Sequence, residues 1–218
     1  MLKAALTCLV LALAGCAGAG GSTTTITGAG AESAVAAVQQ LRSSLQAGEF
    51  ATTGALTIPG QAALASLADE ASIGEVAQAI DEGDAAIAAS FWEGFAQGAG
   101  ESFAGDVAID ERGTTTEDGI EFFLVGVTPG SGVEQTIVTR ESDGQRIDLF
   151  ASFGAGLAAE MMSPVEILLG TSSEDAATVL AALQDVVPSL LVAASNESLS
   201  PDASQRVLQL VELITRVG

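Results

Sequence analysis

Carboxylates are almost the only side chains in this sequence that could carry out acid/base chemistry. The 218 residues include 28 Asp and Glu but no His and no Tyr, and the one Lys is Lys3. A Ser nucleophile would lack its usual base, and no Gly-x-Ser-x-Gly motif occurs. A pair of carboxylates remains as the possible catalytic group, and the candidates are Asp110, Glu111, Glu117 and Asp118. We expect these to lie on a solvated hairpin tip, so no catalytic residue is assigned.

The sequence predicts no cofactor and no metal site. Calcium would suit ligands that are all oxygen, and residues 81–84 read Asp-Glu-Gly-Asp. Their spacing is not that of an EF-hand loop, and the surface of a helix would splay the carboxylates apart. Residues 98–100 read Gly-Ala-Gly but lack the preceding strand of a dinucleotide-binding loop.

A group of aromatic residues is the best candidate for a binding site. Phe91 and Phe95 are four residues apart and share one face of an expected helix, and Trp92, the only Trp, lies one step round that helix. With Phe122 or Phe123, these rings would line a small apolar pocket. The alternative is that they belong to an ordinary core, where a Trp at the edge is common.

The first sixteen residues have the pattern of an export signal. Lys3 is followed by an apolar run over residues 4–14, which is too short to span a bilayer. Residues 13–16 read Leu-Ala-Gly-Cys and resemble the lipobox of bacterial lipoproteins. The resemblance implies cleavage after Gly15 and a diacylglycerol with fatty acids such as palmitate on Cys16. The alternative is an ordinary signal peptide that contains a cysteine.

The cysteine count and the charge restrict what the exported chain can do. Cys8 would leave with the signal and Cys16 would carry lipid, so disulfides, thiolate metal sites and thiol catalysis are excluded. The remaining chain has six Arg against 28 Asp and Glu, a formal charge of −22. Such a surface repels nucleic acid and anionic lipid. An acidic face for cations or basic partners is one interpretation, and a merely solubilising surface is the favoured one.

The hydrophobic pattern predicts helices, then strands, then helices. We expect an α+β fold, with a four-stranded antiparallel meander between N-terminal helices and C-terminal helices packed on the sheet. Residues 1–15 form the signal peptide, 16–30 a lipid-anchored flexible tether and 31–218 a single domain. Residues 50–58 are expected to be a connector. The expected helices cover 31–47, a short segment after Pro59, 72–97 with a break near Gly83, 154–162, 163–170, 172–194 with a kink or break at Pro188, and 201–214. The expected strands cover 106–111, 120–127, 133–141 and 146–152.

The middle of the chain is similar to the sheet of NTF2-like extracytoplasmic domains. Hairpins over residues 117–149 end in a strand of the form acidic–Gly–x–x–hydrophobic–Asp, here Asp143 to Asp148, and a long amphipathic helix precedes them. The resemblance implies a cone-shaped pocket. The chain departs from the family after residue 154, where added helices could fill that pocket.

Three functions are compatible with these features. The first is a non-catalytic lipoprotein with a binding or envelope-support role, held by Cys16 on the extracytoplasmic face of the cell membrane or outer membrane. The alternative is a carrier for a lipid or small apolar ligand between sheet and helices. A carboxylate-based hydrolase comes third. The expected partners are the membrane and either a protein or an apolar ligand, with nucleic acid excluded.

Overall fold

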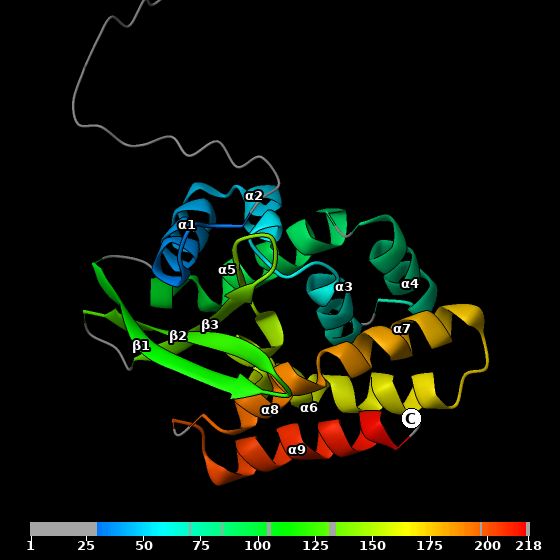
Figure 1. The fold of residues 1–218 in the computed structure, drawn as a ribbon. Helices are drawn as coiled ribbons and strands as arrows, with labels where there is room; N and C mark the ends of the chain where they lie inside the picture. Colours follow the sequence, from blue (N-terminus) through cyan, green and yellow to red (C-terminus); the bar gives the residue numbers. More distant parts are fainter. Residues whose placement is uncertain are drawn as a thin grey trace, which may run out of the picture.

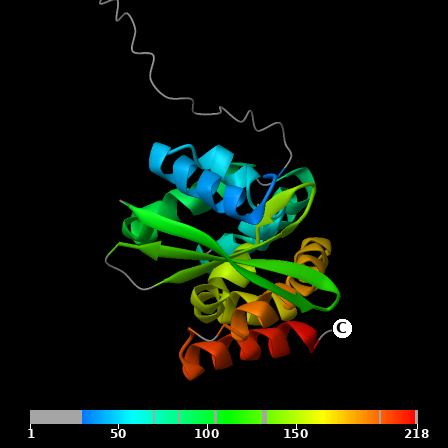
Figure 2. The same ribbon diagram turned by 60° about the vertical axis from the view of Figure 1, so that its left-hand side comes forward.

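The protein is an α+β structure in which helices cover both faces of one antiparallel sheet and pack directly on one another beyond its edge. The computed structural model describes residues 30–69, 71–83, 85–103, 106–130, 134–196 and 198–216. The N-terminal helices lie on one side of the sheet and the C-terminal helices on the other (Figure 1 and Figure 2). The predicted fold class and order of elements are confirmed.

The elements follow one another along the chain in three groups. The N-terminal group is α1 (Ala34–Ala47), α2 (Phe50–Ala55), α3 (Gln61–Ala65), the 3-10 helix η1 (Ser66–Asp69), α4 (Ile73–Glu82) and α5 (Ala85–Phe103). The sheet is β1 (Val107–Glu117), β2 (Ile120–Pro129), β3 (Gln135–Glu141) and β4 (Gln145–Ile147). The C-terminal group is α6 (Leu149–Leu169), α7 (Glu174–Asp185), α8 (Val187–Ala194) and α9 (Pro201–Thr215).

The sheet is a meander in the order β1-β2-β3-β4, with every neighbouring pair antiparallel. Two Asp-Gly pairs make its tight turns. Asp118 and Gly119 have φ of 49° and 77°, and Asp143 and Gly144 have φ of 53° and 93°. Positive φ at consecutive positions suits the right-handed twist of a hairpin and favours Asp followed by Gly. The Asp-Gly signals therefore predicted both turns correctly.

Strand β2 is covered on both of its faces, as its nearly continuous apolar sequence predicted. Phe122 is fully buried on one face, against Val138 of β3, Ala151 of α6 and Val192 of α8. Val125 and Val127 belong to the main hydrophobic core, which draws on α1 and the other N-terminal helices as well as on α6 to α9. The sheet is thus the middle layer of the domain.

Local capping signals set several helix boundaries. The hydroxyl of Ser72 accepts a hydrogen bond from the Glu75 N–H, and the Glu75 carboxylate accepts one from the Ser72 N–H, which completes the predicted capping box. Gly48 ends α1 with a φ of +70°. The predicted break near Gly83 is present, and it separates α4 from α5.

Three predicted boundaries in the helical regions were wrong. Residues 50–58 contain the helix α2, which lacks a side-chain cap and is held by packing, since a Cβ on its Gly54 would lie 2.8 Å from the Cβ of Ala88. Helix α5 continues through Gly98 and Gly100 to Phe103. The expected helices at 154–162 and 163–170 are one helix, α6, which contains Pro164.

The strand predicted at residues 146–152 ends at Ile147. Asp148 caps α6, because its Oδ1 accepts a hydrogen bond of 2.9 Å from the Ala151 N–H. Leu149 and Phe150, which were expected in the strand, are buried in the first turn of this helix. A short apolar run fits a strand and a buried helix equally well by pattern alone.

The described chain enters the domain beside the β3–β4 hairpin. Ala31 and Gln145 exchange two backbone hydrogen bonds of 2.8 Å, and the Gly30 N–H donates to the Asp143 carbonyl. A Cβ on Gly30 would lie 2.6 Å from the Gly144 carbonyl carbon, so this approach needs glycine. Residues 1–29, which contain the predicted signal, most of the tether and Cys16, lie outside the described residues.

Within the described ranges no single helix is long and apolar enough to cross a membrane, although α7 and α8, bent by 44°, meet the length and composition criteria as a pair.

The capping box of α4 should make stability depend on pH. The hydrogen bonds from the Ser72 side chain and backbone lower the pKa of Glu75 from its ordinary value of 4.5. A lowered pKa in the folded state stabilises the protein above the unfolded pKa, and this contribution is lost as pH falls. We expect urea denaturation to show E75Q less stable than the parent at pH 7, with the difference shrinking towards zero below about pH 4.

The control for this measurement is E93Q, which removes an exposed carboxylate from α5. An E75Q deficit that matches E93Q at every pH would contradict the prediction.

Candidate binding site

A groove lies where α5 and α6 meet the beginning of β3. Its volume is about 580 Å³, and residues 198–199, between α8 and α9, also line it. This size falls within the usual range for small-molecule sites. The large apolar side chains that line it are Phe91, Phe95, Ile137, Phe153, Leu157 and Leu199.

Aromatic rings form one wall of the groove. The Phe95 ring lies 6.5 Å from that of Phe91 and 4.9 Å from that of Phe153, centroid to centroid, and all three side chains are half-buried. Trp92 is fully buried behind them, with ring contacts at 5.2 to 6.3 Å to each of the three. Its Nε1–H donates a hydrogen bond of 3.2 Å to the Thr57 hydroxyl. The indole therefore supports the wall from behind.

The predicted pocket residues are thus only partly brought together. Phe91 and Phe95 line the groove, whereas Trp92, Phe122 and Phe123 are not among its lining residues. Phe122 and Phe123 are neighbours on β2, so their side chains point to opposite faces of the sheet. Phe122 packs under α6 and α8, and Phe123 packs against the main core.

Two glycines widen the groove from opposite helices. Gly94 of α5 and Gly156 of α6 both line it, and a Cβ built on either would meet nothing within 4 Å. Glycine inside a helix costs roughly 0.5–1 kcal/mol relative to alanine. Elsewhere on α6, close packing explains a glycine, because a Cβ on Gly154 would lie 3.1 Å from the Cβ of Ala193. Packing gives no such reason for Gly94 and Gly156, which are exposed and face open space where they line the groove.

A second, smaller cavity lies beneath the meander. It has a volume of about 320 Å³ between β2, β3, α6 and α8, and its apolar lining includes Leu124, Val138 and Val192. Thr136 and Asn196 line both this cavity and the groove. The two spaces therefore adjoin, and the C-terminal helices do not completely fill the region under the sheet.

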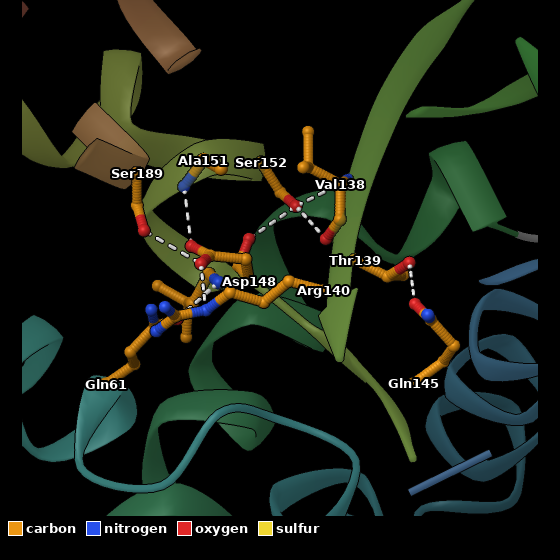
Figure 3. Close-up of polar contacts among 10 residues, drawn as sticks. Gln61, Val138, Thr139, Arg140, Gln145, Asp148, Ala151, Ser152 and Ser189 are labelled. Carbon is orange, nitrogen blue, oxygen red and sulfur yellow. Dashed lines mark hydrogen bonds and ion pairs between the residues drawn. The ribbon is translucent and has the colours of Figure 1, made fainter. Parts of the chain in front are cut away.

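A buried carboxylate fixes α6 to its neighbours and so places one side of the groove. Asp148 is fully buried, and its Oδ2 accepts a hydrogen bond of 2.8 Å from the Ser189 hydroxyl of α8 (Figure 3). The same oxygen lies 3.0 Å from Nε of Arg140 on β3, an ion pair without hydrogen-bond alignment. With Oδ1 bound to the Ala151 N–H, both carboxylate oxygens are engaged, so the role of Asp148 is structural.

Two further polar side chains complete this junction. Gln61 of α3 accepts a hydrogen bond of 2.6 Å from the Leu149 N–H, while its own Nε2 has no partner. The Ser152 hydroxyl accepts from the Val138 N–H at 2.9 Å and donates to the Asp148 carbonyl at 2.6 Å (Figure 3). Because Ser152 lines the groove and precedes Phe153, these bonds set the aromatic wall against β3.

The rim of the groove is held by an ion-pair cluster. Arg112 donates two hydrogen bonds of 2.8 Å to the carboxylate of Glu134, which lines the groove, and lies 2.8 Å from Asp110. The hydrogen bond with Glu134 is the main reason why the pKa of Arg112 is raised. A bulge at this point of β1 directs Arg112 across Gly126, where a Cβ would lie 2.5 Å from Nε of the guanidinium.

The four carboxylates singled out for acid/base chemistry do not surround one loop. Asp110 and Glu111 lie within β1, whereas Glu117 and Asp118 lie at the β1–β2 turn. Glu117 lies seven positions along the strand from Asp110, which corresponds to roughly 20 Å. Paired catalytic carboxylates lie within about 10 Å, so the expected position of Asp110 and Glu111 at a hairpin tip was wrong.

In the described part of the chain no three His, Cys, Asp or Glu side chains gather as metal ligands would. Asp84, which belongs to the acidic run at residues 81–84, lies outside that part.

Several groove residues escaped the sequence-based prediction. Phe153 and Leu157 were not recognised as part of a site, because the preceding residues were assigned to a strand. One feature of the sequence could have revealed the helix that carries them. Asp148 lies three residues before Ala151, which is the spacing between an N-cap residue and the N–H that it binds. Glu134 is brought to Arg112 only by the pairing of three strands, which no local pattern reveals.

Comparisons of the chain with protein-family models, with curated proteins and with solved structures found no match.

Removing the buried carboxylate should destabilise the domain more than removing its neutral partner. We expect D148A to cost about 3 kcal/mol in the free energy of unfolding, since it leaves Arg140 facing a vacated buried site and α6 without its cap. S189A should cost about 1 kcal/mol for one lost hydrogen bond. Urea denaturation measures both, and E160A, an exposed carboxylate on the same helix, is the control. A D148A variant as stable as E160A would contradict the structural role.

Proposed function

We propose that this protein is a lipid-anchored extracytoplasmic binding protein that holds a small apolar ligand in the groove between α5, β3 and α6. Of the functions considered from the sequence, the carrier is the one that the groove supports best. The observation that carries this proposal is the pair of helical glycines, Gly94 and Gly156, which keep an aromatic-lined space open without any packing reason.

Keeping the groove open lowers the stability of the protein. Filling the groove with larger side chains would stabilise both helices by propensity and bury more apolar surface. Proteins commonly give up stability of this kind where function needs it. An apolar ligand would cover the half-buried rings and recover the hydrophobic gain that the empty groove forgoes, at about 25 cal/mol per Å² of apolar surface.

Attachment to the membrane rests on the N-terminal sequence. The lipobox-like residues 13–16, the short apolar run and the small, polar residues that follow them support a lipid anchor on Cys16. The strongly negative chain would gain nothing from adsorption to anionic lipid, so the acyl chains supply the attachment. The role in envelope support and the similarity to NTF2-like domains stay predictions.

Blocking the groove should weaken binding while making the protein more stable. We expect a neutral fluorescent probe, N-phenyl-1-naphthylamine, to bind the parent chain, and G156L to bind it at least tenfold more weakly. Because leucine favours a helix over glycine, G156L should also raise the free energy of unfolding by roughly 0.5–1 kcal/mol. A159L is the matched control, since it adds a large apolar residue to an exposed position of α6 outside the groove. Probe binding that survives in G156L would place the site elsewhere.

The lipid anchor is tested at Cys16. Mass spectrometry of the N-terminal peptide from the parent protein should show cleavage after Gly15 and a diacylglyceryl group on the thiol of Cys16. The α-amino group of Cys16 would be either free or acylated. In C16S this modification should vanish, because serine has no thiol to form the thioether. A native N-terminus that never carries fatty acid would overturn the anchor while leaving the groove proposal untouched.

A further inference from the structure

The charges around the groove define what kind of apolar ligand it takes. Among the described residues, the ionisable side chains that line the groove are Asp69 and Glu134, both carboxylates, and no described Arg lines it. Asp69 is exposed, and the Glu134 side chain is 40% exposed, so both face solvent at the rim. A ligand in the groove therefore meets aromatic rings below and negative charge at the edge.

Arg112 does not reverse this charge. Both carboxylate oxygens of Glu134 accept hydrogen bonds from it, but Asp110 lies equally close to the same guanidinium. The cluster of two carboxylates and one guanidinium keeps a net charge of −1, and Asp69 adds another negative charge. The field of the whole chain, with a formal charge of −21, has the same sign.

We propose that the ligand of this groove is an organic cation with an apolar body, for example an aromatic or alkyl ammonium compound. This inference rests on the proposed function and names the ligand class of the same site. Half-buried rings of Phe91, Phe95 and Phe153 present the apolar contact surface. Aromatic faces also attract cations, while the carboxylates at the rim attract the ammonium and repel fatty acids and other anionic amphiphiles.

Three naphthalene probes, one cationic, one neutral and one anionic, test this inference. They are (2-naphthylmethyl)trimethylammonium, 2-naphthalenemethanol and 2-naphthylacetate, titrated by calorimetry into the full chain carrying C16S, which removes competing acyl groups. We expect the cation to bind about tenfold more tightly than the alcohol, and the anion to bind most weakly. The preference should shrink when salt is raised from about 0.02 M to about 0.5 M, because screening weakens exposed charges.

The double variant D69N/E134Q tests whether the two carboxylates at the rim cause the preference for the cation. It should bring the cation close to the alcohol in affinity, and E160Q on the outside of α6 should keep the parent's preference. Equal affinity for cation and alcohol in the parent, or a preference that survives in D69N/E134Q, would overturn the cation inference and leave the groove proposal standing. If none of the three probes binds, the groove proposal itself fails, and the inference fails with it.

Discussion

The carboxylate of Asp148 is the interaction on which the arrangement of the layers depends. It closes the first turn of α6, accepts the Ser189 hydroxyl from α8 and faces Arg140 on β3. A buried charge is stable only with such partners, and the N-terminus of a helix is where a negative charge is favoured. The direction in which α6 leaves the sheet is fixed there, and with it the positions of Phe153 and Gly156 in the groove.

Much of the fold followed from short-range rules, because those rules describe interactions between residues close in sequence. The serine caps at Ser72 and Ser200 and the two Asp-Gly turns need only their neighbours to form. Helix α2 could not be predicted in this way, since it has no side-chain cap and its Gly54 fits against Ala88 of a distant helix. The start of α6 was only partly predictable. The sequence contained an N-cap residue, Asp148, but the apolar residues that follow it fitted a strand as well as a helix.

The candidate site was harder to predict than the fold because its walls come from separate parts of the chain. The spacing of Phe91 and Phe95 placed them together on one helix face, and both line the groove. The pattern could not distinguish Trp92, which supports them from behind, from a lining residue. Nor could it show that Gly156 faces open space whereas Gly154, two residues earlier, packs tightly against α8. That distinction requires the neighbouring helices.

The place where the chain enters the domain has a mechanical consequence. Residues 30–31 are bonded to the β3–β4 hairpin at Asp143 and Gln145, whereas the groove lies at the opposite end of β3, near Glu134. Tension applied to the chain ahead of Gly30 would be taken first by the hydrogen bonds of Gly30 and Ala31 along the edge of the sheet. The walls of the groove lie about 20 Å further along the strand. They would carry no part of that load until the hydrogen bonds at the edge of the sheet broke.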